Sequence, residues 1–187
     1  NVNNKKLLVQ YADGLVNSIS TLFQKSIEQK YQTLQVEVLT TLSCLASVLD
    51  TNFEPYYNKF MPGLKQILAT VKWETQQEQE LRASCIDSIG YILTSVKKTH
   101  SFAKMMPLKF AKIVELLVSG NLQDSDPQLT CISNTIAQIC VCLKEEFKQF
   151  LPHIVPALLR DADKDIDFKV KDADEMDGEE ESEDKGI

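Results

Sequence analysis

A repeat of about 45 residues is the feature that most restricts how this chain can fold. Pro62, Pro107 and Pro152 are 45 residues apart, and each follows an apolar residue. Three columns of apolar residues keep the same spacing: Leu15, Phe60, Met105 and Phe150; Phe23, Leu68, Ile113 and Leu158; and Tyr57, Phe102 and Phe147. A fixed period of this length is the signature of stacked repeat units, so the chain is expected to form a solenoid.

Between these columns the apolar residues recur at steps of three and four, which is the period of an amphipathic helix. The pattern predicts seven helices, over residues 6–27, 31–49, 54–71, 79–97, 102–118, 127–145 and 147–160. Taken in pairs, they give an A and a B helix per repeat, ending on an A helix without a partner. Helix pairs of 40 to 47 residues are typical of HEAT repeats. The predicted fold class is therefore all-α, an α-solenoid of about three and a half HEAT pairs, with a bending proline inside every A helix after the first, which has Asn17 at the equivalent position.

The charge is unevenly distributed along the 187 residues. The formal net charge is −7, but residues 1–160 carry a net charge of +2 and residues 161–187 a net charge of −9. This division predicts a HEAT solenoid over residues 1–160 and an acidic, disordered loop or tail over residues 161–187. Such a segment could attract basic proteins, or it could simply be a solvated stretch that adds solubility. Its candidate cargo-attracting residues are Asp172, Asp174, Glu175, Asp177, Glu179, Glu180, Glu181, Glu183 and Asp184.

Several classes of protein are disfavoured by what the sequence lacks. It contains no phosphate-binding glycine loop, no nucleophile elbow and no zinc-protease motif. His100 and His153 lie in different repeats, and the five cysteines form no CxxC pair. We therefore predict no enzyme activity and no catalytic, cofactor-binding or metal-binding residues. The near-neutral body has no basic stripe for direct nucleic-acid binding, and no apolar run suits a membrane helix. Because the chain begins at Asn1 rather than methionine, we expect a piece of a longer polypeptide.

The B helices carry the candidate binding positions, because solenoids bind extended ligands on the surface that these helices line. Aligning the small residues Ala46, Gly90 and Ala137 selects two rows of polar side chains on the B helices: Ser43, Asp87 and Asn134, and Ser47, Tyr91 and Gln138. The carboxylate and the amides could bind a basic peptide, and Tyr91 could stack on an aliphatic stem or a cation. The alternative is that these rows are an ordinary solvated helix face.

Four stretches of this sequence resemble the importin-beta superfamily of karyopherins, and within it the importin beta-3 (importin five) type. They are residues 53–67, 80–90, 124–128 and 144–152. The resemblance implies a nuclear import receptor that shuttles between cytoplasm and nucleus. It would carry basic cargo, such as ribosomal proteins or histones, through interactions with nuclear pore proteins, and release it to Ran-GTP. It also implies that residues 161–184 correspond to an acidic loop between the A and B helices of the last repeat.

Two other functions stay open at this point. The chain could be a static HEAT scaffold that holds the subunits of a larger complex, because periodicity alone does not separate a scaffold from a transport receptor. An enzyme would require a pocket that brings His100 or His153 together with carboxylates.

Overall fold

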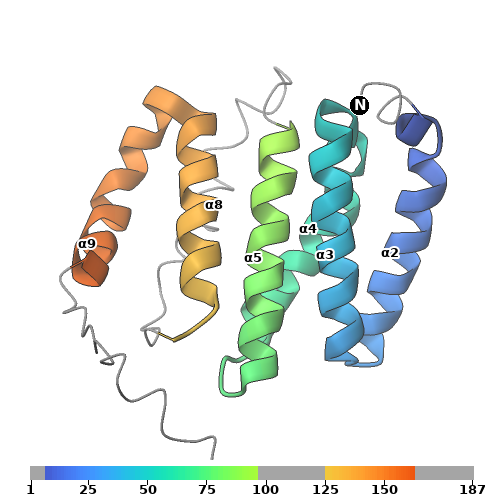
Figure 1. Ribbon diagram of the computed structural model, residues 1–187, viewed down its shortest axis with the longest axis horizontal. Coiled ribbons are helices and arrows are strands. Elements are labelled where there is room, and N and C mark those ends of the chain that lie inside the picture. Colours follow the sequence, from blue (N-terminus) through green and yellow to red (C-terminus); the bar gives the residue numbers. More distant parts are fainter. Residues whose placement is uncertain (1–6, 97–124, 163–187) are drawn as a thin grey trace, which may run out of the picture.

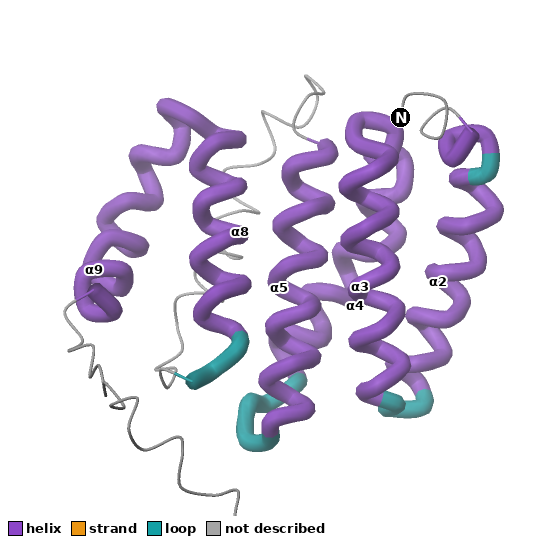
Figure 2. Tube along the Cα trace, in the orientation of Figure 1, coloured by secondary structure: helices purple, strands orange, loops and turns teal. Residues whose placement is uncertain are grey.

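The described part of the chain is helical throughout. The computed structural model describes residues 7–96 and 125–162, and Figures 1 and 2 show helices joined by short loops within those ranges. The elements are α2 (Ala12–Glu28), α3 (Gln32–Leu49), η1 (Asp50–Tyr56), α4 (Tyr57–Thr70), α5 (Gln76–Val96), α8 (Gln128–Leu143), η2 (Lys144–Phe150) and α9 (Leu151–Ala162). The predicted all-α solenoid is confirmed. The predicted helix over residues 102–118, Pro107 and the acidic segment lie outside the described residues.

The B helices stand side by side. Figure 1 shows α3, α5 and α8 in one row, and α5 contacts both of the others. The A helix α2 packs on α3, whereas η1 and α4 pack on α5. Large side chains fill the space between A and B helices, among them Phe53, Phe60, Leu39, Leu42 and Leu49, each fully buried. Apolar burial of this kind is the main favourable contribution to folding.

Among the A helices that the structure describes, the predicted period of 45 residues relates α2 to α4. Ala12, Val16, Ile19 and Phe23 of α2 are buried, and so are the residues 45 positions later in α4, Tyr57, Met61, Leu64 and Leu68. The B helices follow a period of 47 instead. The buried residues Leu39 and Leu42 of α3 correspond to Ile86 and Ile89 of α5, and Ile89 corresponds to Ile136 of α8. The two extra residues match the upper end of the HEAT range.

The junctions between a B helix and the next A helix confirm the spacing of 47. Asp50 ends α3 at φ 51° and ψ −129°, and Lys144 ends α8 at φ 51° and ψ −121°. A seven-residue 3₁₀ helix follows each of them. Since residues 50 and 144 are separated by twice 47, the same left-handed turn closes both B helices. Residues other than glycine adopt such angles at a cost.

The prolines need a corresponding correction. Pro62 lies inside α4, as predicted, at its sixth position. Pro152 is only the second residue of α9, where a missing backbone N–H costs little. Pro156 is the sixth residue of α9 and therefore the structural counterpart of Pro62. Sequence comparison selected Pro152 because positions one helical turn apart lie on the same face of a helix and cannot be separated by hydrophobic pattern.

A buried arginine joins three helices near the turn between α4 and α5. The side chain of Arg82 is 5% exposed. Its Nη1 donates to the carbonyl oxygens of Leu68 at 2.6 Å and Val71 at 3.0 Å, and its Nε donates to Gln128 Oε1 of α8 at 2.8 Å. Burial lowers the pKa of the guanidinium from its ordinary value, although Cys85 and Asp126 oppose this shift. Arg82 thus caps the end of α4 and links α5 to the next B helix.

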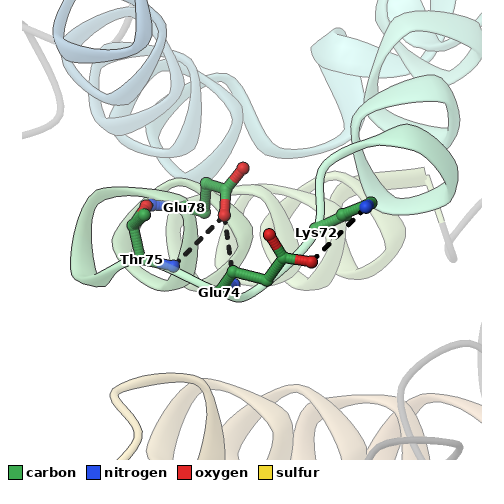
Figure 3. Close-up of polar contacts among 4 residues, drawn as sticks. All are labelled: Lys72, Glu74, Thr75 and Glu78. Atoms are coloured by element: carbon green, nitrogen blue, oxygen red, sulfur yellow. Dashed lines mark hydrogen bonds and ion pairs between the residues drawn. The ribbon is translucent and has the colours of Figure 1, made fainter.

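The turn that precedes α5 is fixed by a capping box, shown in Figure 3. Glu78 Oε2 accepts hydrogen bonds from the backbone N–H groups of Glu74 at 3.1 Å and Thr75 at 3.2 Å. In return, the Thr75 hydroxyl accepts from the N–H of Glu78 at 3.3 Å. This reciprocal pairing satisfies donors that the first turn of a helix leaves open. Trp73 of the same turn lies over the Arg82 guanidinium, 4.8 Å from carbon to ring centroid.

The stretch Gln32–Thr70 is long and apolar enough to cross a membrane by length and composition alone. In the structure it is not one rod, because the left-handed turn at Asp50 separates α3 from η1 and α4. The apolar stripe of α3, including Leu42, Ala46 and Leu49, is buried in the protein core. The segment is therefore accounted for as core helices of the solenoid.

Candidate functional site

Hydroxyl groups set the register between neighbouring B helices. Ser88 of α5 donates to the carbonyl of Leu39 in α3 at 3.0 Å, and Ser95, two turns further on, donates to the carbonyl of Ala46 at 2.8 Å. Across the next contact, Thr135 of α8 donates to the carbonyl of Ile86 at 3.2 Å. The donors Ser88 and Thr135 are 47 residues apart, and so are their acceptors Leu39 and Ile86. The same contact is therefore repeated from one pair of B helices to the next with the period of 47.

This register corrects the sequence alignment of the B helices. Gly90 and Ala137 are equivalent, as predicted, but their counterpart in α3 is Ser43 rather than Ala46. Ser43 is buried, and its hydroxyl lies 2.9 Å from that of Ser88. The polar rows therefore become Thr40, Asp87 and Asn134, and Cys44, Tyr91 and Gln138. Of the aligned small residues, Ala46 and Gly90 are buried, whereas Ala137 is exposed.

A groove of about 390 Å³ lies along α3 and α5, where the first two members of each polar row are found. We call it the α3–α5 groove. Four of the six predicted B-helix residues line it, namely Ser43, Ser47, Asp87 and Tyr91. The others that line it are Thr40, Cys44, Val48, Ala83, Ser84 and Cys131. The sequence alignment missed Thr40 and Cys44 because it placed α3 out of register, and the 47-residue spacing of Ser88 and Thr135 is the signal that would have found these two.

Asp87 provides the only carboxylate of the α3–α5 groove. The side chain is half-buried, and no hydrogen bond or ion pair joins it to another described residue. Burial raises the pKa of its carboxyl above the ordinary value. Cys131 also lines the groove, and the pKa of its thiol is raised, first by burial and then by the charge of Asp87. A carboxylate in this position has lost part of its hydration and gained no cation in exchange, so it favours a cationic ligand.

The two remaining predicted residues are the members of the polar rows that lie on α8, and they are outside the groove. Asn134 is exposed on α8, and Gln138 is half-buried next to Gly90. The nine predicted acidic residues between 172 and 184 fall outside the described residues. Among those described, His, Cys, Asp and Glu side chains form no group of three or more that could hold a metal ion.

The cysteines differ in their surroundings. Cys85 is fully buried, its thiol lies 3.3 Å from the Leu64 carbonyl, and burial raises its pKa strongly. Cys44 and Cys140 are exposed. The thiols of Cys44, Cys85, Cys131 and Cys140 are free.

Comparison with known proteins agrees with this architecture. Residues 3–177 match the family model described as importin subunit beta-1-like, TPR repeats. The chain belongs to the importin-beta family. TPR and HEAT repeats both stack antiparallel helix pairs into solenoids, so the match fits the observed fold.

Two importins illustrate the relationship. Importin subunit beta-3 of Saccharomyces cerevisiae is 25% identical over 158 residues, which are 83% of this chain and 14% of that protein. Probable importin subunit beta-4 of Schizosaccharomyces pombe is 30% identical over 130 residues, 66% of this chain and 12% of that protein. This importin-beta chain therefore spans about one seventh of the length of these relatives or less. The resemblance stated from four sequence stretches is confirmed.

The fold is shared with a solved karyopherin structure. The crystal structure of Kap121p bound to Ste12p superimposes with a TM-score of 0.67 and 24% sequence identity, over 92% of this chain and 15% of that one. At this level of identity the similarity concerns the fold. The helix pairs of this importin-beta chain therefore stack into the same α-solenoid fold.

Proposed function

We propose that this chain is part of a nuclear transport receptor and that it binds a basic segment of protein cargo in the α3–α5 groove. The observation that carries the proposal is the single half-buried carboxylate of Asp87, which has no cationic partner among the described residues. A lysine or arginine side chain entering the groove would supply that partner. Its aliphatic stem would pack on Tyr91 and Val48, both of which line the same groove.

The relatives support this proposal. They are importins by name, and Kap121p was crystallised with Ste12p, so a solenoid of this type can bind another protein. On this proposal the chain is not an enzyme and needs no cofactor.

The direct test uses a fluorescein-labelled, lysine-rich peptide of about fifteen residues and the complete 187-residue chain. Fluorescence anisotropy should show saturable binding that weakens as salt increases, because charge attraction contributes to it. Asp87→Ala and Tyr91→Ala should each weaken binding by about tenfold, an amount typical of a central contact. Glu37→Ala removes an exposed carboxylate from α3 outside the groove and is the matched control. Equal affinity for wild type, Asp87→Ala and Tyr91→Ala would refute the proposal.

The remaining parts of the proposal concern the longer protein. We propose that it shuttles between cytoplasm and nucleus, contacts nuclear pore proteins and releases basic cargo to Ran-GTP. A pull-down of a lysine-rich cargo on the full-length protein, with and without Ran-GTP, tests this. Release by Ran-GTP is expected of a receptor, whereas retention in its presence would favour a static scaffold.

We also propose a division between a solenoid body over residues 1–160 and an acidic segment over residues 161–187. The net charges of +2 and −9 support it. Limited proteolysis should remove the acidic segment before it cuts the body, and a segment that resists cleavage as well as the body does would contradict this division.

A further inference from the structure

Gln138 of α8 belongs to the same polar row as Cys44 and Tyr91 but does not line the groove. Its equivalents at the 47-residue spacing are Cys44 and Tyr91, and both line the α3–α5 groove. The Oε1 atom of Gln138 instead points at α5, where it is buried and has no hydrogen-bond partner within the described residues. A buried acceptor without a donor is unfavourable, since water would have satisfied it. The free protein therefore buries this amide oxygen without a hydrogen bond, and a donor on a bound ligand could supply one.

Gly90 makes this position possible. A Cβ atom on residue 90 would lie 2.8 Å from Gln138 Oε1 and 2.9 Å from Thr135 Oγ1. Any other residue would have to displace these side chains, whereas glycine leaves room for the amide against the backbone of α5. The contact also lies within the seam between α5 and α8, one turn beyond the bond from Thr135 to the Ile86 carbonyl.

We propose that Gln138 couples occupancy of the groove to the packing of α5 against α8. This inference rests on the proposed peptide binding. Neighbouring packed helices are about 8–10 Å apart, and an extended peptide advances about 3.3 Å per residue. A peptide with its cation at Asp87 therefore reaches the α8 members of the polar rows about three residues later. There the side chain of Gln138 moves away from Gly90, and its Oε1 accepts a hydrogen bond from a backbone N–H of the peptide. The packing of α5 against α8 becomes less tight as a result.

The coupling is reciprocal, because whatever displaces Gln138 in the free protein lowers the free energy needed for binding. Gln138 is thus a positioning residue, because its side chain links peptide binding in the groove to the contact between α5 and α8. It need not be the strongest contact of the peptide. Its distinguishing property is that stability of the free protein and affinity for the peptide change in opposite directions.

The test compares wild type with Gln138→Met, which fills a similar volume without a carbonyl acceptor. The melting temperature should rise by about 3 °C, and affinity for the lysine-rich peptide should fall by about fivefold. A rise in melting temperature with unchanged affinity would show a purely structural residue and overturn the proposal. A loss of affinity without any rise would show an ordinary contact that is already free to bind, and would overturn it equally.

Two further variants separate the coupling from the proposed function. Gly90→Ala should lower the melting temperature yet raise peptide affinity about threefold, because the amide is already displaced. Ser95→Ala, which breaks a bond in the other seam, should lower the melting temperature and leave affinity unchanged. If Gly90→Ala weakens binding, the coupling fails while the groove remains. If wild type binds no peptide, the proposed function fails and the coupling with it, although the stability of Gln138→Met still tests the buried acceptor.

Discussion

Replacing Arg82 tests whether one buried side chain holds three helices together. Arg82→Met keeps much of the apolar stem and removes all three hydrogen bonds to Leu68, Val71 and Gln128. It also removes the stacking contact with Trp73. Each hydrogen bond from a charged donor contributes about 1.5–3 kcal/mol. Part of this is offset, because the guanidinium no longer has to be buried. We expect a net loss of about 3 kcal/mol in the free energy of unfolding.

The assay is urea denaturation followed by far-ultraviolet circular dichroism, with a thermal melt beside it. For a chain of this length, about 3 kcal/mol corresponds to a fall of about 9 °C in melting temperature. Arg82→Lys keeps the charge but replaces the planar guanidinium and its several N–H donors with one ammonium group, so the free energy of unfolding should fall by about half as much. Lys25→Met, an exposed cation of α2, is the control and should stay within about 0.5 kcal/mol of wild type. A loss below about 1 kcal/mol for Arg82→Met would refute this account of the junction.

Three further predictions concern the core, a strained turn and the groove. Phe60→Ala should lower the free energy of unfolding by about 3–5 kcal/mol in the same assay, because Phe60 is fully buried and contacts the rings of Phe23 and Phe53; a loss near zero would contradict its central place. Lys144→Gly should raise stability by about 1 kcal/mol by relieving the left-handed turn at φ 51°, and lower stability would mean that the turn is not strained. The raised pKa of Asp87 predicts that peptide affinity falls as the pH drops through that pKa, above the ordinary value of 3.8; Asp87→Asn should abolish this pH dependence and, since it removes a half-buried charge, should not destabilise the free protein at pH 7.

The sequence was sufficient to predict the all-α solenoid, because the buried stripes of α3, α5 and α8 follow the helical period closely. Six of the seven predicted helices are found, and the seventh lies outside the described residues. The predicted period of 45 residues fits α2 and α4, but the B helices follow a period of 47. Hydrophobic columns cannot separate Pro152 from Pro156, since the two are one turn apart on one face.

The candidate site could be predicted only in part, for the same reason. Asp87 and Tyr91 were found directly, because polar residues stand out on the exposed face of an amphipathic helix. Their partners on α3 were displaced by three positions. The register between helices depends on side-chain hydrogen bonds to backbone carbonyls, such as that from Ser88 to Leu39. A hydropathy pattern does not reveal such bonds. The buried position of the Gln138 side chain likewise could not be predicted, because it depends on Gly90 of a different helix.

The central claim is that a basic peptide lies along the row of B helices at the α3–α5 groove. Its most direct test is photo-crosslinking with a lysine-rich peptide that carries a photoreactive residue three positions from the central lysine, followed by mass-spectrometric mapping on the complete chain. The account predicts crosslinks to residues of the groove and of the polar rows on α8, above all Thr40, Cys44, Tyr91 and Gln138, and their loss in Asp87→Ala. Crosslinks that map to α2 and α4 instead, and that persist in Asp87→Ala, would contradict it.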